Sequence, residues 1–119
     1  MSDNIILNKT YQFAVQAVKL SQYLVDERKE YVLSKQILRS GTSIGANTEE
    51  AIGGFSKKDF IYKLNIAYKE ARETKYWLRI LKDTGYIENE EFEKLFDELE
   101  QILKILFTII KKSKENGDR

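Results

Sequence analysis

The sequence predicts an all-α protein that folds as an antiparallel up-down-up-down four-helix bundle. Apolar residues recur at spacings of three and four along almost the whole chain, the pattern of amphipathic helices. The 119 residues include no proline and only 6 glycines, so a strand-rich or loop-rich fold has little support. Short polar corners make consecutive helices antiparallel neighbours. We expect a single domain, residues 1–119, with helices over about 5–25, 30–52, 56–83 and 88–113.

The first helix, over 5–25, is predicted from the apolar residues on its inner side. These residues are Phe13, Ala14, Ala17, Val18, Leu20, Ser21, Leu24 and Val25. The charged residues 26–29 leave room only for a tight connection. The second helix should therefore run back along the first.

The second helix, over 30–52, contains the segment SGTSIGAN, whose serine and glycine content is typical of a loop. One face nevertheless continues through it at helical spacing, so we expect an unbroken helix. That face comprises Leu33, Ile37, Ser40, Ile44, Asn47 and Ala51. Gly41 and Gly45 lie four residues apart, on the same side of a helix, where they would let another backbone approach closely. We expect the helix to end at Gly53 and Gly54, because glycine readily adopts the αL conformation that ends helices.

The third helix, over 56–83, has the clearest start. Ser56 can act as N-cap with Asp59 at the third helical position, and Phe55 and Phe60 have the spacing of a hydrophobic staple. The sector that we expect to be buried comprises Phe60, Leu64, Ala67, Ala71, Thr74, Trp77, Leu78 and Leu81.

The opposite face of the third helix carries a stripe of cations interleaved with tyrosines. It comprises Lys58, Tyr62, Asn65, Lys69, Arg72, Tyr76 and Arg79. Cations for phosphates and aromatic rings for bases are what single-strand binding needs, so six of these are candidate nucleic-acid-binding residues. They are Lys58, Tyr62, Lys69, Arg72, Tyr76 and Arg79. The alternative is a solvated face on which Lys69 pairs with Glu73 and Arg72 also pairs locally.

The fourth helix, over 88–113, follows a stop at Gly85, with Ile87 and Phe92 at staple spacing. Its apolar face, which includes Phe107, is wider than one seam of a bundle needs, because only Lys104 and Thr108 are polar between 102 and 110. The third helix also has a second apolar flank. Self-association would bury both surfaces. The candidate subunit-interface residues are Ile66, Trp77, Ile80, Ile105 and Ile109.

The chain lacks the residues and motifs that most enzymes use. The chain has no cysteine and no histidine, and it carries no glycine-rich phosphate loop, nucleophile–base pair or cofactor motif. Carboxylates at positions 49, 50, 70 and 73 invite comparison with di-metal bundles, but those sites need a Glu-x-x-His motif. We therefore expect no enzyme, no cofactor and no metal, and we expect ion pairs at helix or subunit seams instead.

Charge is unevenly distributed along a chain whose net charge is only +1. Residues 31–82 carry 10 basic and 5 acidic groups, whereas residues 83–101 carry 1 and 8. Intramolecular pairing and a binding surface both explain this segregation. No apolar run approaches the ~18 residues of a membrane span, and the N-terminus lacks a signal-peptide pattern, so we expect a cytoplasmic protein without a membrane partner.

Two segments, LSKQILRSGTSIGANTEEA and FIYKLNIAYKEARETKYWL, resemble the bacterial four-helix-bundle family first described as encoded by intervening sequences of 23S rRNA genes, also labelled S23 ribosomal protein. The matching pattern residues are Arg39, Ser43, Asn47, Glu50, Ala67 and Glu73. The resemblance implies a ring-like homopentamer. The accessory variability determinant protein of diversity-generating retroelements is similar to this family, which implies RNA or DNA, and a protein such as a reverse transcriptase, as candidate partners.

These observations together predict a non-enzymatic oligomeric scaffold or adaptor that engages RNA or DNA electrostatically. The competing hypothesis is a purely structural protein–protein interaction module that binds no nucleic acid. The two differ in salt dependence, because phosphate contacts make affinity fall steeply with ionic strength and an apolar groove does not.

Overall fold

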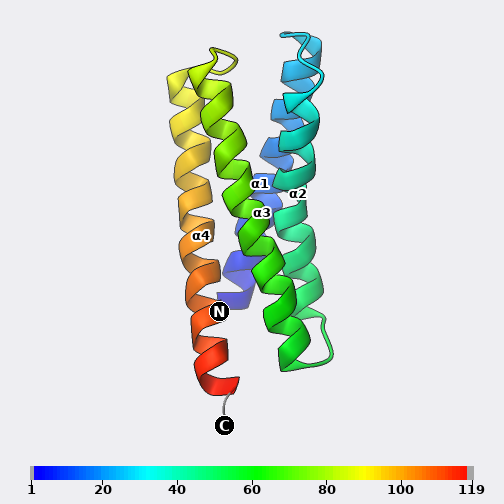
Figure 1. The fold of residues 1–119 in the computed structure, drawn as a ribbon, viewed down its shortest axis with the longest axis vertical. Coiled ribbons are helices and arrows are strands. Elements are labelled where there is room, and N and C mark those ends of the chain that lie inside the picture. The colour runs from blue at the N-terminus through cyan, green and yellow to red at the C-terminus, as the bar shows by residue number, and fades with distance from the viewer. Residues whose placement is uncertain (1, 118–119) are drawn as a thin grey trace.

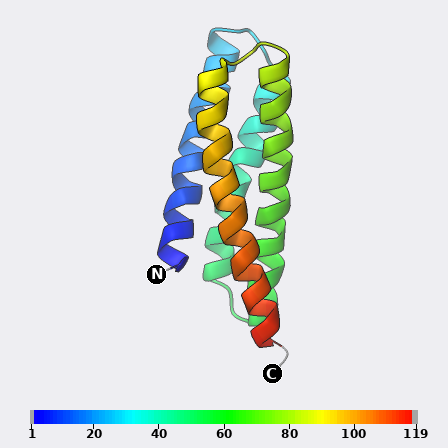
Figure 2. The ribbon, with the colours of Figure 1, turned by 90° about the vertical axis from the view of Figure 1, so that its left-hand side faces the viewer.

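The computed structural model describes residues 2–117, with side chains described for 5–116, and it contains four α-helices. They are α1 (Ser2–Asp26), α2 (Leu33–Ile52), α3 (Lys57–Asp83) and α4 (Asn89–Gly117). Each helix packs on its neighbour in sequence, and α4 returns to α1 to close the bundle (Figures 1 and 2). The predicted up-down-up-down bundle is confirmed. Within the described residues, none of the helices combines the length and apolar character required to cross a membrane.

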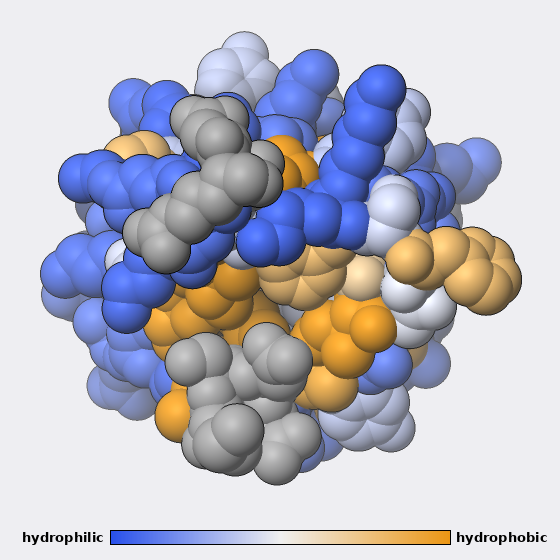
Figure 3. Space-filling model, turned by 90° about the horizontal axis from the view of Figure 1, so that it is seen from below, coloured by the Kyte–Doolittle hydropathy of each residue, from blue (hydrophilic) through white to orange (hydrophobic). Residues whose placement is uncertain are grey.

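One continuous apolar core fills the bundle, because each helix turns one stripe inward at spacings of three and four. Its fully buried large side chains include Phe13, Leu24, Ile37, Ile44, Leu64, Leu78, Leu99 and Leu106. Seen from the end where α2 turns into α3, apolar side chains gather near the centre and polar ones surround them (Figure 3). The expected inner face of α1 is largely correct, but Val18 is exposed and Ile6 and Thr10 are buried instead.

Helix α2 runs unbroken through the serine- and glycine-rich segment, as predicted. A Cβ at Gly41 would lie 2.6 Å from Ala17 Cβ, and one at Gly45 would lie 3.2 Å from the Thr10 carbonyl oxygen. The two glycines therefore allow α1 to approach the α2 backbone. The buried hydroxyl of Thr48 donates to the carbonyl oxygen four residues earlier, at 2.8 Å, so burial of this polar side chain leaves no unpaired donor.

The start of α2 lies three residues later than predicted, at Leu33. The reason is that the Glu30 carboxylate accepts hydrogen bonds from the backbone N–H groups of Val32 (3.2 Å) and Ser34 (2.7 Å), which places Glu30 before the helix. Burial raises the pKa of this carboxyl, but the backbone N–H groups of residues 32–34 outweigh burial and hold the pKa below its usual value.

The corners after α2 and α3 use glycine differently. The stop predicted at Gly85 is confirmed, and this residue has φ +82°. Helix α2 ends before Gly53, as predicted, but Gly53 has φ −85° and Gly54 has no positive φ, so the αL conformation predicted there is wrong. A Cβ at Gly54 would lie 2.5 Å from an Asp59 carboxylate oxygen, which rotation of that side chain can relieve, and 3.1 Å from the Ala51 carbonyl oxygen. The Ser56 cap is confirmed by its 3.0 Å hydrogen bond from the Asp59 N–H. The predicted staple is wrong, because Phe55 is fully exposed.

The four seams of the bundle are unequal. Helices α1 and α4 have the sparsest packing of any neighbouring pair, and Figure 2 shows them spreading apart toward the N-terminus of α1. An exposed hydrogen bond from Lys9 Nζ to Gln101 Oε1, at 2.8 Å, spans this seam. Shallow clefts follow the seam, and one of about 440 Å³ has Leu20 and Ile87 among its lining residues. The α2–α3 and α1–α2 seams are the most densely packed.

Candidate nucleic-acid interface

The basic stripe of α3 faces solvent. All six candidate residues, Lys58, Tyr62, Lys69, Arg72, Tyr76 and Arg79, are exposed, because the core sector of α3 occupies the other side of the helix. The Tyr76 ring lies edge-on to the Trp77 ring, with centroids 5.2 Å apart. Nucleic-acid binding by these residues stays a prediction.

Cations on the two flanks of α3 are paired with neighbouring helices. Lys63 Nζ lies 2.8 Å from Glu50 Oε1 of α2, and the hydrogen bond and charge of that carboxylate raise the pKa of Lys63. Lys75 Nζ lies 2.8 Å from Glu100 Oε2 of α4. By contrast, within residues 5–116 no ion pair involves a cation of the stripe. Two flank cations of α3 are thus paired with carboxylates, and a third, Lys82, lies 4.8 Å from the centre of the Phe92 ring, whereas the stripe is exposed.

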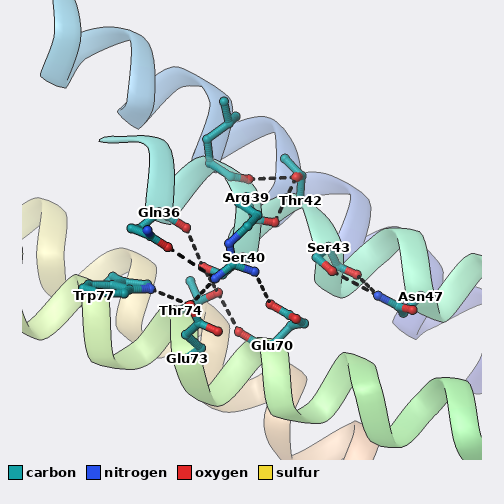
Figure 4. A network of polar contacts seen from close by, with 11 residues as sticks. Gln36, Arg39, Ser40, Thr42, Ser43, Asn47, Glu70, Glu73, Thr74 and Trp77 are labelled. Carbon is teal, nitrogen blue, oxygen red and sulfur yellow. Dashed lines mark hydrogen bonds and ion pairs between the residues drawn. The ribbon is translucent and has the colours of Figure 1, made fainter. Parts of the chain in front are cut away.

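The α2–α3 seam holds a polar network around Arg39 (Figure 4). The Arg39 guanidinium donates to Glu70 Oε1 at 3.2 Å and to Glu73 Oε2. Trp77 Nε1 donates to the same Glu73 oxygen at 2.9 Å. Glu73 is therefore engaged by α2 and by Trp77, and within residues 5–116 it forms no ion pair along α3 with Lys69. The alternative of a solvated face stays a prediction. The expectation of ion pairing at a helix seam is confirmed.

The structure brings only part of the family pattern together. Arg39 meets Glu73 across the seam, whereas Ser43 and Asn47 bond to each other along α2, with Asn47 Nδ2 donating to Ser43 Oγ at 3.0 Å. Glu50 pairs with Lys63, and Ala67 is buried in the core. These contacts assign structural roles within the subunit to the pattern residues. Among the side chains that the structure describes, no three carboxylates gather closely enough to hold a metal ion.

The predicted interface residues fall on two separate seams. Ile66, Glu73 and Ile80 follow one another at seven-residue spacing, so the two isoleucines share the flank of α3 that faces α2. Trp77, one turn from Glu73, extends this flank. Ile105 and Ile109 instead line a cleft of about 280 Å³ with Ile5 of α1. All five predicted side chains, Ile66, Trp77, Ile80, Ile105 and Ile109, are half-buried, and their role in self-association stays a prediction.

A second cleft, which sequence reasoning missed, lies between α3 and α4. It has a volume of about 380 Å³, and its lining residues are Tyr68, Arg72, Lys75, Glu100, Leu103, Lys104, Phe107 and Thr108. Phe107, which we placed on the wide apolar face of the fourth helix, is 55% exposed, with its ring centroid 6.3 Å from that of Tyr68. The sequence does indicate that Phe107 is exposed, because it lies outside the sector that Leu99, Ile102 and Leu106 define at helical spacing.

Fold and surface together define a four-helix-bundle protein with an exposed basic helix face. The family model of the 23S rRNA-intervening sequence protein matches residues 2–108, and the chain belongs to this family. A crystal structure of a protein with unknown function from the S23 ribosomal protein family of Bacteroides thetaiotaomicron VPI-5482 is similar to it. The two share 54% identity with a TM-score of 0.92, over 93% of this chain and 99% of that chain. No curated protein matches the sequence.

Proposed function

We propose that this protein is a non-enzymatic oligomeric scaffold or adaptor that binds RNA or DNA electrostatically through the basic stripe of α3. The observation that carries the proposal is the division of cations on α3. Lys63 and Lys75 are neutralised by carboxylates of α2 and α4, whereas the cations of the stripe are exposed and form no ion pair within residues 5–116. The positive potential of the stripe is therefore available to phosphates.

The length and composition of the stripe suit a nucleic-acid strand. From Lys58 to Arg79 it extends about 30 Å at the ~1.5 Å rise of an α-helix. Tyr62 and Tyr76 are both exposed along it, so an aromatic ring accompanies the cations at two levels. Cations that follow the backbone and rings that stack on bases bind single strands with little sequence preference. We therefore propose single-stranded RNA or DNA as the ligand.

A triple substitution tests the stripe. Lys69, Arg72 and Arg79 are replaced together by Gln, and fluorescence anisotropy measures binding to labelled single-stranded RNA and DNA at several salt concentrations. If each cation contacts one phosphate, binding weakens and the slope of log affinity against log salt becomes shallower by about 2, at ~0.7 per contact. Far-UV circular dichroism confirms that the variant remains helical.

The matched control removes the same charge from another exposed site. Lys111, Lys112 and Lys114 of α4 are all exposed, and their replacement by Gln should alter binding much less. Equal losses in the two variants would mean that net charge, and not the stripe, determines affinity. If wild-type protein binds neither polymer at low salt, the competing hypothesis of a protein interaction module takes over.

The scaffold part of the proposal rests on the two separate half-buried apolar surfaces. Ile66, Trp77 and Ile80 lie beside α2, and Ile105 and Ile109 lie beside α1. Unlike surfaces at different seams suit a head-to-tail interface, which can close into a ring. Five subunits is the count that the family resemblance implies. Leaving these surfaces in water would forfeit about 25 cal/mol per Å² of apolar area.

Light scattering tests the assembly. A pentamer has a mass near five times 14.0 kDa, a monomeric wild-type protein would refute the scaffold, and another count would refute only the number five. Trp77→Glu places a charge in the proposed interface and should dissociate the assembly with helical content retained. The control, Tyr31→Glu, changes an exposed aromatic residue at the α1–α2 corner and should leave the mass unchanged. If Trp77→Glu unfolds the subunit, Trp77 belongs to the core.

A further inference from the structure

The cleft between α3 and α4 combines an exposed aromatic ring with cations from both helices. We propose that this cleft takes one base of a single-stranded nucleic acid, stacked on Phe107, with the adjoining phosphates on Arg72 and Lys104. The proposal rests on the proposed function and adds a defined base site to it. Arg72 belongs both to the basic stripe and to the cleft, so a strand that follows the stripe passes the cleft.

Phe107 provides a face on which a base can stack. Its 55% exposure contrasts with Leu103, Leu106 and Ile110, which are buried around it on the same helix. The ring lies next to the Tyr68 ring, with centroids 6.3 Å apart and planes inclined by 46°, so two neighbouring aromatic rings, one from each helix, line the cleft. The cleft volume of about 380 Å³ falls within the range of small-molecule sites.

The charges of the cleft favour an anionic ligand at its rim. Inside the cleft, Lys75 is already paired, because its Nζ lies 2.8 Å from Glu100 Oε2 and 5.2 Å from the centre of the Phe96 ring. The positive charge of Lys75 is therefore offset by the negative charge of Glu100. Arg72 on α3 and Lys104 on α4 are exposed and form no ion pair within residues 5–116, so the rim stays positive.

The same chemistry disfavours a protein as the occupant. The centres of protein–protein interfaces are depleted in lysine, because burial of an ammonium group is costly. This cleft is lined by two lysines, beside an arginine and two aromatic rings of kinds that protein–protein interfaces also contain. A nucleotide needs that combination, since base and phosphate are covalently joined and require a ring and a cation side by side.

The test compares a base-bearing strand with a strand that has none. Fluorescein-labelled oligothymidylate and an abasic deoxyribose-phosphate oligomer of the same length carry the same phosphates, and only the first can stack. Phe107→Leu keeps an apolar side chain and removes the aromatic face, and Phe107→Trp restores a ring. The control is Phe55→Leu, which changes a fully exposed phenylalanine at the α2–α3 corner.

We expect Phe107→Leu to bind oligothymidylate about 5- to 140-fold more weakly, the range for loss of one stacked base, and to bind the abasic oligomer as wild-type protein does. Phe107→Trp should restore the affinity, and Phe55→Leu should not alter it. Lys104→Gln should weaken binding of both oligomers and reduce the salt slope by about 0.7.

Four outcomes would overturn the base site. Wild-type protein that binds both oligomers equally would show purely electrostatic binding, which leaves the proposed function standing without a base site. An equal loss for both oligomers in Phe107→Leu would exclude stacking. If Phe107→Leu instead lowers the mass seen by light scattering with affinity unchanged, the cleft is an interface between copies of the chain. Wild-type protein that binds neither oligomer would overturn the proposed function as well.

Discussion

Gly41→Ala tests whether the close contact of α1 with α2 depends on a missing side chain. The new Cβ would lie 2.6 Å from Ala17 Cβ, whereas apolar carbons reach their best separation at ~3.5–4.0 Å. Rotation of a side chain cannot relieve this overlap, because both carbons are bonded directly to their backbones. The two helices must therefore separate locally by about 1 Å.

Two opposing terms set the size of the effect. Alanine is favoured over glycine inside a helix by ~1 kcal/mol, which would stabilise the variant. Overpacking of a well-filled core costs ~1–3 kcal/mol. Because the overlap involves two backbones, we expect overpacking to dominate, with a net loss of about 1 kcal/mol in the free energy of unfolding and an upper bound of about 2 kcal/mol.

A double-mutant cycle isolates the overlap from helix propensity. Urea unfolding, followed by far-UV circular dichroism, compares wild type, Gly41→Ala, Ala17→Gly and the double variant. Without the Ala17 methyl group, Gly41→Ala should stabilise by ~1 kcal/mol through propensity alone, which gives a coupling energy of ~1–3 kcal/mol between the two sites. Gly53→Ala is the control, since its Cβ would meet no atom closer than 3.6 Å.

The reasoning fails if Gly41→Ala is more stable than wild type, or if the cycle shows no coupling. Either result would mean that α1 adjusts freely on α2. The glycines would then serve no packing purpose, and their propensity cost would have no compensation.

Two further changes probe the corners of the bundle. Because the folded state holds the pKa of Glu30 below 4.5, the stability that its charge contributes is present above about pH 4.5 and is lost as pH falls through the lowered pKa. Glu30→Gln should thus lower the free energy of unfolding by about 0.3–1 kcal/mol near neutral pH, and urea titrations should show this difference vanish in acid; a constant difference would contradict it. Arg28 Nη1 donates to the carbonyl oxygens of Gly85 at 3.0 Å and Tyr86 at 2.8 Å, so Arg28→Ala should cost about 1 kcal/mol in urea titrations. Lys35→Ala, which removes an exposed cation on α2, should cost much less, and equal losses would show that the carbonyl contacts contribute nothing.

The helices themselves could be predicted because their information is local. Apolar spacings of three and four predict that α2 continues through a segment whose composition indicates a loop. Ser40 can be buried in this segment because its hydroxyl forms hydrogen bonds with Gln36 and, across the seam, with Thr74. The end of a helix depends on individual hydrogen bonds. A carboxylate at Glu30 can start a helix or cap it from outside, and periodicity does not distinguish the two.

The candidate site could be predicted only in outline. The exposed stripe of α3 follows from the helical wheel, since it lies opposite the buried residues. The pairing of Lys63 with Glu50 and of Lys75 with Glu100 depends on how far each neighbouring helix is rotated, which no single-helix pattern contains. The α3–α4 cleft is a product of the same rotations. The helical wheel of α4 places Phe107 outside the core sector, but it cannot show that its ring lies beside Tyr68.

The sparse packing between α1 and α4 determines where the bundle opens locally. Transient opening starts where the fewest contacts must be broken, so it separates α1 from α4 and leaves the densely packed α2–α3 pair intact. We expect amide protons near the start of α1 and in the second half of α4 to exchange with solvent well before those of α2 and α3. A neighbouring copy that covers Ile105 and Ile109 would slow exchange there specifically, so the dependence of these rates on protein concentration reports on assembly without any label.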